Sequence, residues 1–167
     1  MTPQIGSAIS GKVISLLTAP MGGVNANLVA LTQGRALVPS IFSPAQVRSG
    51  NISSALAERS DTVQYPAANV YCEKLTNSQL EKFRTFSGNL QMAIELKNSE
   101  DRLDNVQANL EIYADAVMAV LATNQGDWGG GMYYAGGYQV TFGAVKHGGK
   151  NFIQTAKITF EIGVSIS

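Results

Sequence analysis

The residues that could support chemistry are few, and the first of them lie near the N-terminus. Gly6 to Val13 reads GSAISGKV and nearly matches the phosphate-binding pattern GxxxxGK[ST]. That pattern needs a hydroxyl side chain at its last position to hold magnesium, and it needs a buried strand before the loop. Val13 has no hydroxyl, and only a short stretch precedes Gly6. We therefore favour an amphipathic helix over a nucleotide site.

The remaining ionisable and nucleophilic candidates are isolated. Glu111 and Asp115 are four residues apart on a predicted helix and share a face, as paired acid–base carboxylates would, but a solvated helix face is the commoner use of this spacing. His147, the one histidine, falls in a predicted turn, and Cys72, the one cysteine, falls in a predicted strand where a buried inert thiol is common. We predict no catalytic residues, no cofactor-binding residues and no metal ligands, and hence a protein that is not an enzyme and uses no cofactor.

A glycine-rich segment over residues 124–137 carries three large aromatic residues, Trp128, Tyr133 and Tyr134. It follows a predicted helix and precedes a predicted strand, whereas a dinucleotide-binding loop runs from strand to helix. The glycines predict a mobile or specially turned loop. The aromatic residues either anchor an interface or fold back on the sheet, and the sequence leaves both interpretations open.

The elements that would position these residues follow from hydrophobic periodicity. Helices are predicted over residues 3–19 and 100–123, and strands over residues 68–75, 90–97, 138–144 and 151–167. Ser99 is expected to cap the second helix, and residues 76–85 read as a polar connector. This order predicts an α+β fold, with a small, mostly antiparallel sheet and helices packed on one face. We expect a single domain over 1–167, with an N-terminal helix and irregular region over 1–62 and a core of sheet plus helix over 63–167.

The predicted C-terminal strand is longer than the usual ~5–6 residues. Apolar and polar residues alternate along it, so it has one apolar face. If both of its edges are paired within the domain, it is a long core strand, which is the interpretation we favour. If one stretch projects, its backbone groups are open to another chain. The candidate interface residues are then Phe152 and Ile153, together with Trp128, Tyr133 and Tyr134.

Composition limits the class of partner. Charged residues make up 14% of the chain, below the ~25% of a typical domain, and twelve basic residues balance twelve acidic ones. Two explanations of the low charge remain open: a large polar but uncharged surface, or a surface largely covered by partners. The balance of charges disfavours nucleic-acid binding by bulk charge. No apolar run approaches the ~20 residues of a membrane span, and the N-terminus lacks the basic region of a signal peptide. We expect no membrane association and folding in a reducing cytoplasm.

From Tyr65 onward the chain resembles the tail terminator and tail-completion proteins of tailed bacteriophages, which join head to tail at the neck. An extended YPAANVYCEKL segment is followed by FRTFSGNLQMAIEL and by the helix DRLDNVQANLEIYADAVMAVLATN. The glycine-rich GDWGGGMYYAGGY and the closing pair YQVTFGAVKHGGKNFIQTAKITFEIGVSIS complete the order. The resemblance rests on this order of elements and on the NFIQTAKITFEI ending.

The resemblance implies a structural virion protein that assembles in the cytoplasm of a host bacterium. It implies a homo-hexameric ring in the virion tail or neck that caps the finished tail tube and presents a surface to the head connector. Genomic DNA would only pass through the lumen. An alternative is another phage component, such as a head-completion or tail-tube protein, and a further one is a small ligand-binding module that uses the glycine loop.

Overall fold

The computed structural model describes residues 4–36, 38–52, 63–148 and 151–167. Its helices are α1 (Ile5–Leu17), α2 (Val24–Thr32) and α4 (Leu103–Thr123), with a short 3-10 turn η1 (Pro44–Gln46). The long strands are β2 (Ala67–Asn77), β3 (Phe86–Glu100) and β8 (Asn151–Ile166). The short strands are β1 (Val47–Ser49), β4 (Gly126–Gly129), β5 (Met132–Tyr134), β6 (Tyr138–Phe142) and β7 (Lys146–Gly148).

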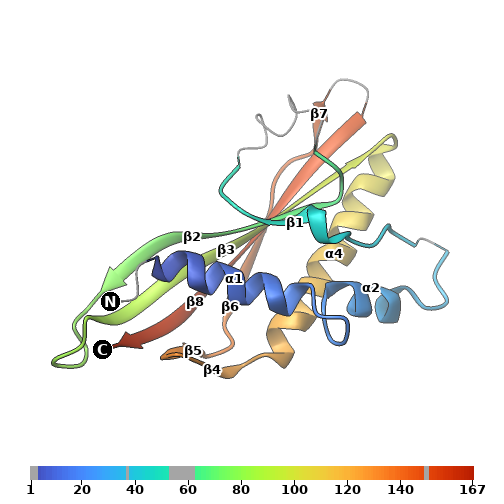
Figure 1. The fold of residues 1–167 in the computed structure, drawn as a ribbon. Helices are drawn as coiled ribbons and strands as arrows, with labels where there is room; N and C mark the ends of the chain where they lie inside the picture. The colour runs from blue at the N-terminus through green and yellow to red at the C-terminus, as the bar shows by residue number, and fades with distance from the viewer. Residues whose placement is uncertain (1–3, 37, 53–62, 149–150) are drawn as a thin grey trace.

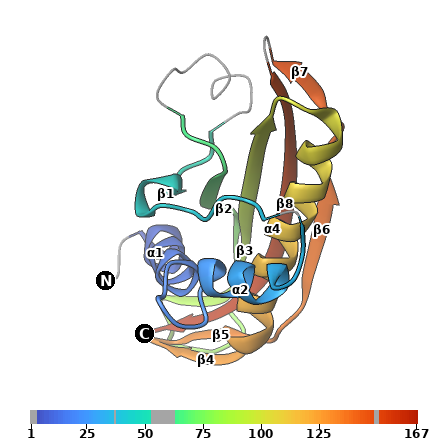
Figure 2. The same cartoon turned by 90° about the vertical axis from the view of Figure 1, so that its right-hand side faces the viewer.

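All eight strands that the structure describes belong to one curled sheet, and every pairing among them except that of β1 with β2 is antiparallel. The three helices lie against the same face of this sheet (Figures 1 and 2). The predicted α+β class, the mostly antiparallel sheet and the long C-terminal strand are therefore confirmed.

The period-two patterns explain which face of the sheet is covered. Val70 of β2, Ile94 of β3 and Ile158 of β8 occupy adjacent register positions, and all three are fully buried in the core beneath the helices. Burying an apolar side chain of this size contributes ~1.5–3 kcal/mol, so these alternating rows fix the strand register. The opposite, helix-free face carries the polar partners of the alternation, such as Gln91 and Lys157.

β8 lies in the middle of the sheet and is paired along both edges. On one side it pairs with β3 from Phe152 to Ile166, and on the other with β7, β6 and β5 in succession. This is the long core strand, the first of the two interpretations offered by its length. The second interpretation, a projecting stretch with open backbone groups, is wrong because the neighbouring strands take up both edges.

The helices depart from expectation mainly at their ends. α4 begins at Leu103 rather than at residue 100, because β3 runs on to Glu100 and absorbs Ser99 into the sheet. The predicted Ser99 cap is therefore wrong: the N-cap residue is Arg102, and it makes no side-chain capping bond. The region predicted to be irregular contains α2, η1 and β1, and its residues 53–62 lie outside the described part of the chain.

Candidate interaction surface

The most exposed apolar side chains near one another belong to the turn between β2 and β3. Leu75 is 53% exposed, Leu80 72% and Phe83 99%. We call residues 75–84, which run from the end of β2 through this turn, the hairpin tip. Single exposed apolar residues are ordinary, but three within residues 75–83 need an explanation. The tip stands beside the C-terminus, at the lower left of Figure 1.

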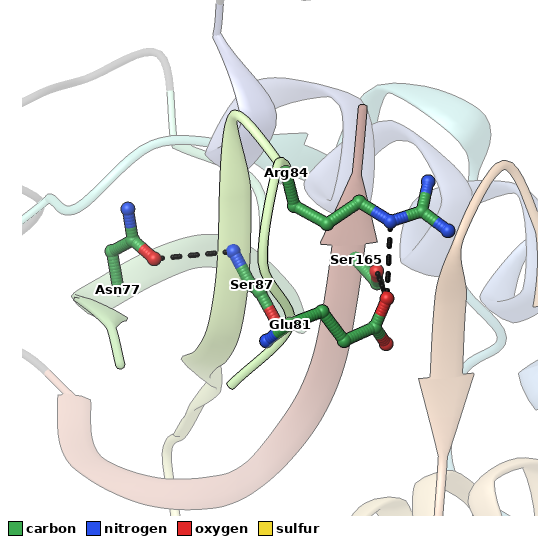
Figure 3. A network of polar contacts seen from close by, with 5 residues as sticks. All are labelled: Asn77, Glu81, Arg84, Ser87 and Ser165. Atoms are coloured by element: carbon green, nitrogen blue, oxygen red, sulfur yellow. Dashed lines mark hydrogen bonds and ion pairs between the residues drawn. The ribbon is translucent and has the colours of Figure 1, made fainter. Parts of the chain in front are cut away.

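A set of short-range hydrogen bonds gives the tip a defined shape (Figure 3). The Asn77 Oδ1 accepts hydrogen bonds from the backbone N–H of Ser87, at 3.1 Å, and from that of Gln79, at 3.3 Å. The Ser87 Oγ accepts from the backbone N–H of Glu81 at 3.1 Å. An asparagine that bonds to nearby backbone in this way replaces ladder hydrogen bonds that the turn cannot make.

The same network ties the tip to the last strand. One Glu81 carboxylate oxygen accepts from Arg84 Nε and from Ser165 Oγ, each at 3.0 Å, as Figure 3 shows. The Arg84 and Glu81 side chains are 40% and 52% exposed, so this ion pair contributes at most about 1 kcal/mol to stability. Its contribution is therefore mainly geometric, because it holds the middle of the turn against β8.

The backbone of the tip is strained at its aromatic residue, Phe83. Phe83 has a φ of 64° and Gln79 a φ of 49°, both in the left-handed region. For a bulky residue such as phenylalanine this conformation costs on the order of 1 kcal/mol. In the described chain no burial offsets that cost at Phe83, since the side chain is almost fully exposed. An aromatic residue held in a strained and solvated position suggests a role outside the folded monomer.

The sequence predicted a different set of interface residues, and the structure places two of the aromatic ones inside. Tyr134 is fully buried, and its ring centroid lies 5.5 Å from that of Phe160 and 5.6 Å from that of Trp128. The half-buried Trp128 donates a hydrogen bond from Nε1 to the carbonyl oxygen of Asn124 at 2.7 Å. Both side chains fold back on the sheet, while Tyr133 stays exposed beside Gly163 of β8.

The glycine-rich segment is a β4–β5 hairpin, so it is specially turned. Gly131 shows why glycine is required: its φ is +82°, and a Cβ there would lie 2.0 Å from the carbonyl oxygen of Ser165. The other two predicted interface residues lie in the β7–β8 hairpin. Ile153 is buried, and the half-buried Phe152 packs edge-on against His147, with ring centroids 5.3 Å apart.

The candidate chemical residues are dispersed over the fold. Gly6 lies in α1 where the helix backbone crosses β2, and a Cβ there would come within 3.0 Å of the Cys72 Cβ. Close helix–strand packing therefore accounts for this glycine without a phosphate. Burial raises the pKa of the Cys72 thiol, which disfavours the reactive thiolate. His147 lies in β7, and within the residues described, no three His, Cys, Asp or Glu side chains gather in a way that could hold a metal ion.

Glu111 and Asp115 belong to a second surface feature, at the outer side of α4. A shallow hollow there is lined by Leu103, Asp104, Gln107, Ala108 and Glu111, and we call it the α4 hollow. Leu103 is 52% exposed, and Asp104, Glu111 and Asp115 are all exposed. No lysine or arginine occurs within α4, so every charged residue of this helix is acidic.

Sequence reasoning missed the hairpin tip. It treated residues 76–85 as a polar connector because no period-two or helical pattern runs through them. The available signal was the presence of Leu80 and Phe83 in an otherwise polar turn. A search for periodic hydrophobic patterns does not detect such residues, because they are isolated rather than repeated at a regular spacing.

In comparisons with known proteins, no protein-family model and no curated protein matches the chain. Of the helices that the structure describes, none has the length and apolar character needed to cross a membrane.

Proposed function

We propose that this chain is a structural protein of a tailed-phage virion, a tail terminator that assembles as a ring on the end of the tail tube and joins it to the head connector. The main support for the proposal is the hairpin tip. Its turn is ordered by the hydrogen bonds of Glu81 with Ser87 and Ser165, yet the side chains of Leu80 and Phe83 remain exposed to solvent. Ordered apolar groups of this kind favour a protein whose working residues are contacts with other chains.

The rest of the surface supports an assembly role. A ring of identical copies uses two different patches on each chain, and the contact closes by rotation. The apolar tip and the acidic outer side of α4 are two such patches of contrasting character. A partner-covered surface also accounts for the charged fraction of only 14%.

Electron microscopy of the purified protein, alone and mixed with tail tubes, tests the proposal. Closed rings of about six copies seated on tube ends are expected. Open filaments would favour the alternative of a tail-tube protein, because such proteins polymerise into stacks. Saturable binding of a small molecule, lost on substitution of Trp128, would favour a ligand-binding module and contradict the proposal.

A further inference from the structure

We infer that the hairpin tip of one copy docks on the α4 hollow of the next copy, so that identical chains join head to tail. The inference deepens the proposed function, because it names the contact by which a ring would form. It rests on three properties of the two surfaces: apolar match, opposite charge and placement at opposite ends of the molecule.

The apolar match involves the exposed side chains that the folded monomer leaves without cover. Leu80 and Phe83 project from the tip, and Leu103 and Ala108 line the α4 hollow. Aromatic anchors that enter a partner's pocket commonly carry much of the energy of an interface. Phe83 is the natural anchor, because its side chain is almost fully exposed while the surrounding turn is held by hydrogen bonds.

The charges of the two surfaces are opposite. Within the tip, Glu81 is paired with Arg84, which leaves Lys82 with no ion-pair partner among the residues that the structure describes. Just before the tip, Glu73 is paired with Lys157, and Lys74 likewise has no ion pair there. The α4 hollow presents Asp104 and Glu111, and these carboxylates likewise have no ion pair within the described chain. Complementary charges of this kind set the register of a contact and exclude wrong ones.

The placement of the two surfaces makes the contact heterologous. β3 begins at Phe86, just after the tip, and runs to Glu100, just before α4 begins at Leu103. Measured along its path in the curled sheet, a strand of this length extends for roughly 50 Å at ~3.3 Å per residue. The tip is at the lower left of Figure 1 and the start of α4 at the upper right. A tip therefore cannot reach its own hollow, and repeated tip-to-hollow contacts give a ring or a filament.

A charge exchange tests the contact. Sedimentation velocity is measured for the wild-type chain, for Lys82→Glu, for Glu111→Lys and for the double variant. We expect each single reversal to weaken self-association about tenfold or more, and the double variant to recover most of it, because close charge pairs are restored. The pair Lys82→Glu with Asp104→Lys is measured in the same way, because Asp104 and Glu111 line the same hollow.

A mixing experiment tests the head-to-tail geometry. The variant Phe83→Asn lacks a working tip, and Glu111→Lys lacks a working hollow, but each retains the other surface. At a protein concentration between the Kd of the wild type and the raised Kd of the variants, each variant alone should be mostly monomeric, and an equal mixture should form pairs that stop at two copies. Glu161→Lys is the matched control, because Glu161 is an exposed carboxylate in a separate hollow on β8 and should leave association unchanged.

The contact is overturned if the wild-type chain stays monomeric up to millimolar concentration, or if neither double variant associates better than its single reversals. Loss of association in Glu161→Lys, with none in Glu111→Lys, would also overturn it. Open filaments that obey the charge exchange would support the contact and contradict the terminator ring. Rings that ignore the exchange would support the terminator and contradict this contact.

Discussion

Replacing Phe83 by asparagine separates the stability of the fold from assembly. The phenylalanine side chain is 99% exposed, so its removal forfeits almost no burial in the monomer. Its φ of 64° is a conformation that asparagine adopts more readily than phenylalanine. We therefore expect Phe83→Asn to leave the monomer as stable as the wild type, or more stable by up to about 1 kcal/mol. For a chain of this size, that upper limit corresponds to a rise in Tm of ~2–4 °C.

The same substitution should weaken association strongly. Burying a phenylalanine side chain in a contact contributes about 1.5–3 kcal/mol, which corresponds to roughly a tenfold to hundredfold change in Kd. Urea unfolding at low protein concentration measures the first quantity, and sedimentation equilibrium measures the second. Phe83→Asn should thus weaken association without lowering the stability of the monomer.

Phe142→Asn provides the matched contrast. Phe142 is 45% exposed and sits in β6 opposite Ala156, so about half of its side chain is already buried in the monomer. Its replacement should cost on the order of 1 kcal/mol of stability and leave association unchanged. If Phe83→Asn instead destabilised the monomer by more than 1 kcal/mol, the view of Phe83 as an unpacked residue would be wrong.

Three further predictions concern the fold. Gly131→Ala should destabilise the protein by roughly 2 kcal/mol or more in urea unfolding, because its Cβ would collide with the carbonyl oxygen of Ser165 at a φ that disfavours alanine. Desolvation lowers the pKa of the buried Lys97 ammonium below the usual 10.5. As the pH rises from this lowered pKa toward 10.5, the wild type should therefore gain stability relative to Lys97→Met. A difference in unfolding free energy between the two proteins that stays constant with pH would contradict this. Burial raises the pKa of Tyr113 and raises that of Tyr134 to about 12, so both side chains stabilise the fold fully below pH 10 and lose this effect above it. For each tyrosine, the free energy of unfolding should fall by up to ~1.4 kcal/mol per pH unit above pH 10. In a pH titration of the folded protein, the tyrosinate absorbance of these two residues should appear above pH 10.

The sequence alone predicted those helices and strands in which a hydrophobic pattern continues over many residues. The alternation from Leu90 to Lys97 and from Asn151 onward predicted β3 and β8, and the spacing from Leu103 to Leu121 predicted α4. In each case one face is buried, so the period of the pattern and the period of the structure agree. The boundaries were less certain, as Ser99 shows, because a capping residue and a strand residue are locally interchangeable.

Features that depend on tertiary contact were not predictable in this way. The glycines of residues 124–137 indicated an unusual turn, but the β4–β5 hairpin and the burial of Tyr134 depend on the presence of β8 and Phe160 alongside. The tip network is also non-local, since Ser165 reaches Glu81 from the far end of the chain. No window of sequence brings these two residues together.

The position of β8 has a consequence for synthesis. Of the strands that the structure describes, β8 is synthesised last, and it fills the centre of the sheet between β3 and the strands β5, β6 and β7. Until it emerges, two groups of strands lack their common neighbour, and Glu81 lacks the Ser165 hydroxyl that helps to shape the tip. Completion of the sheet and ordering of the tip are thus coupled to completion of β8. A chain interrupted before that strand would be unable to present a finished tip.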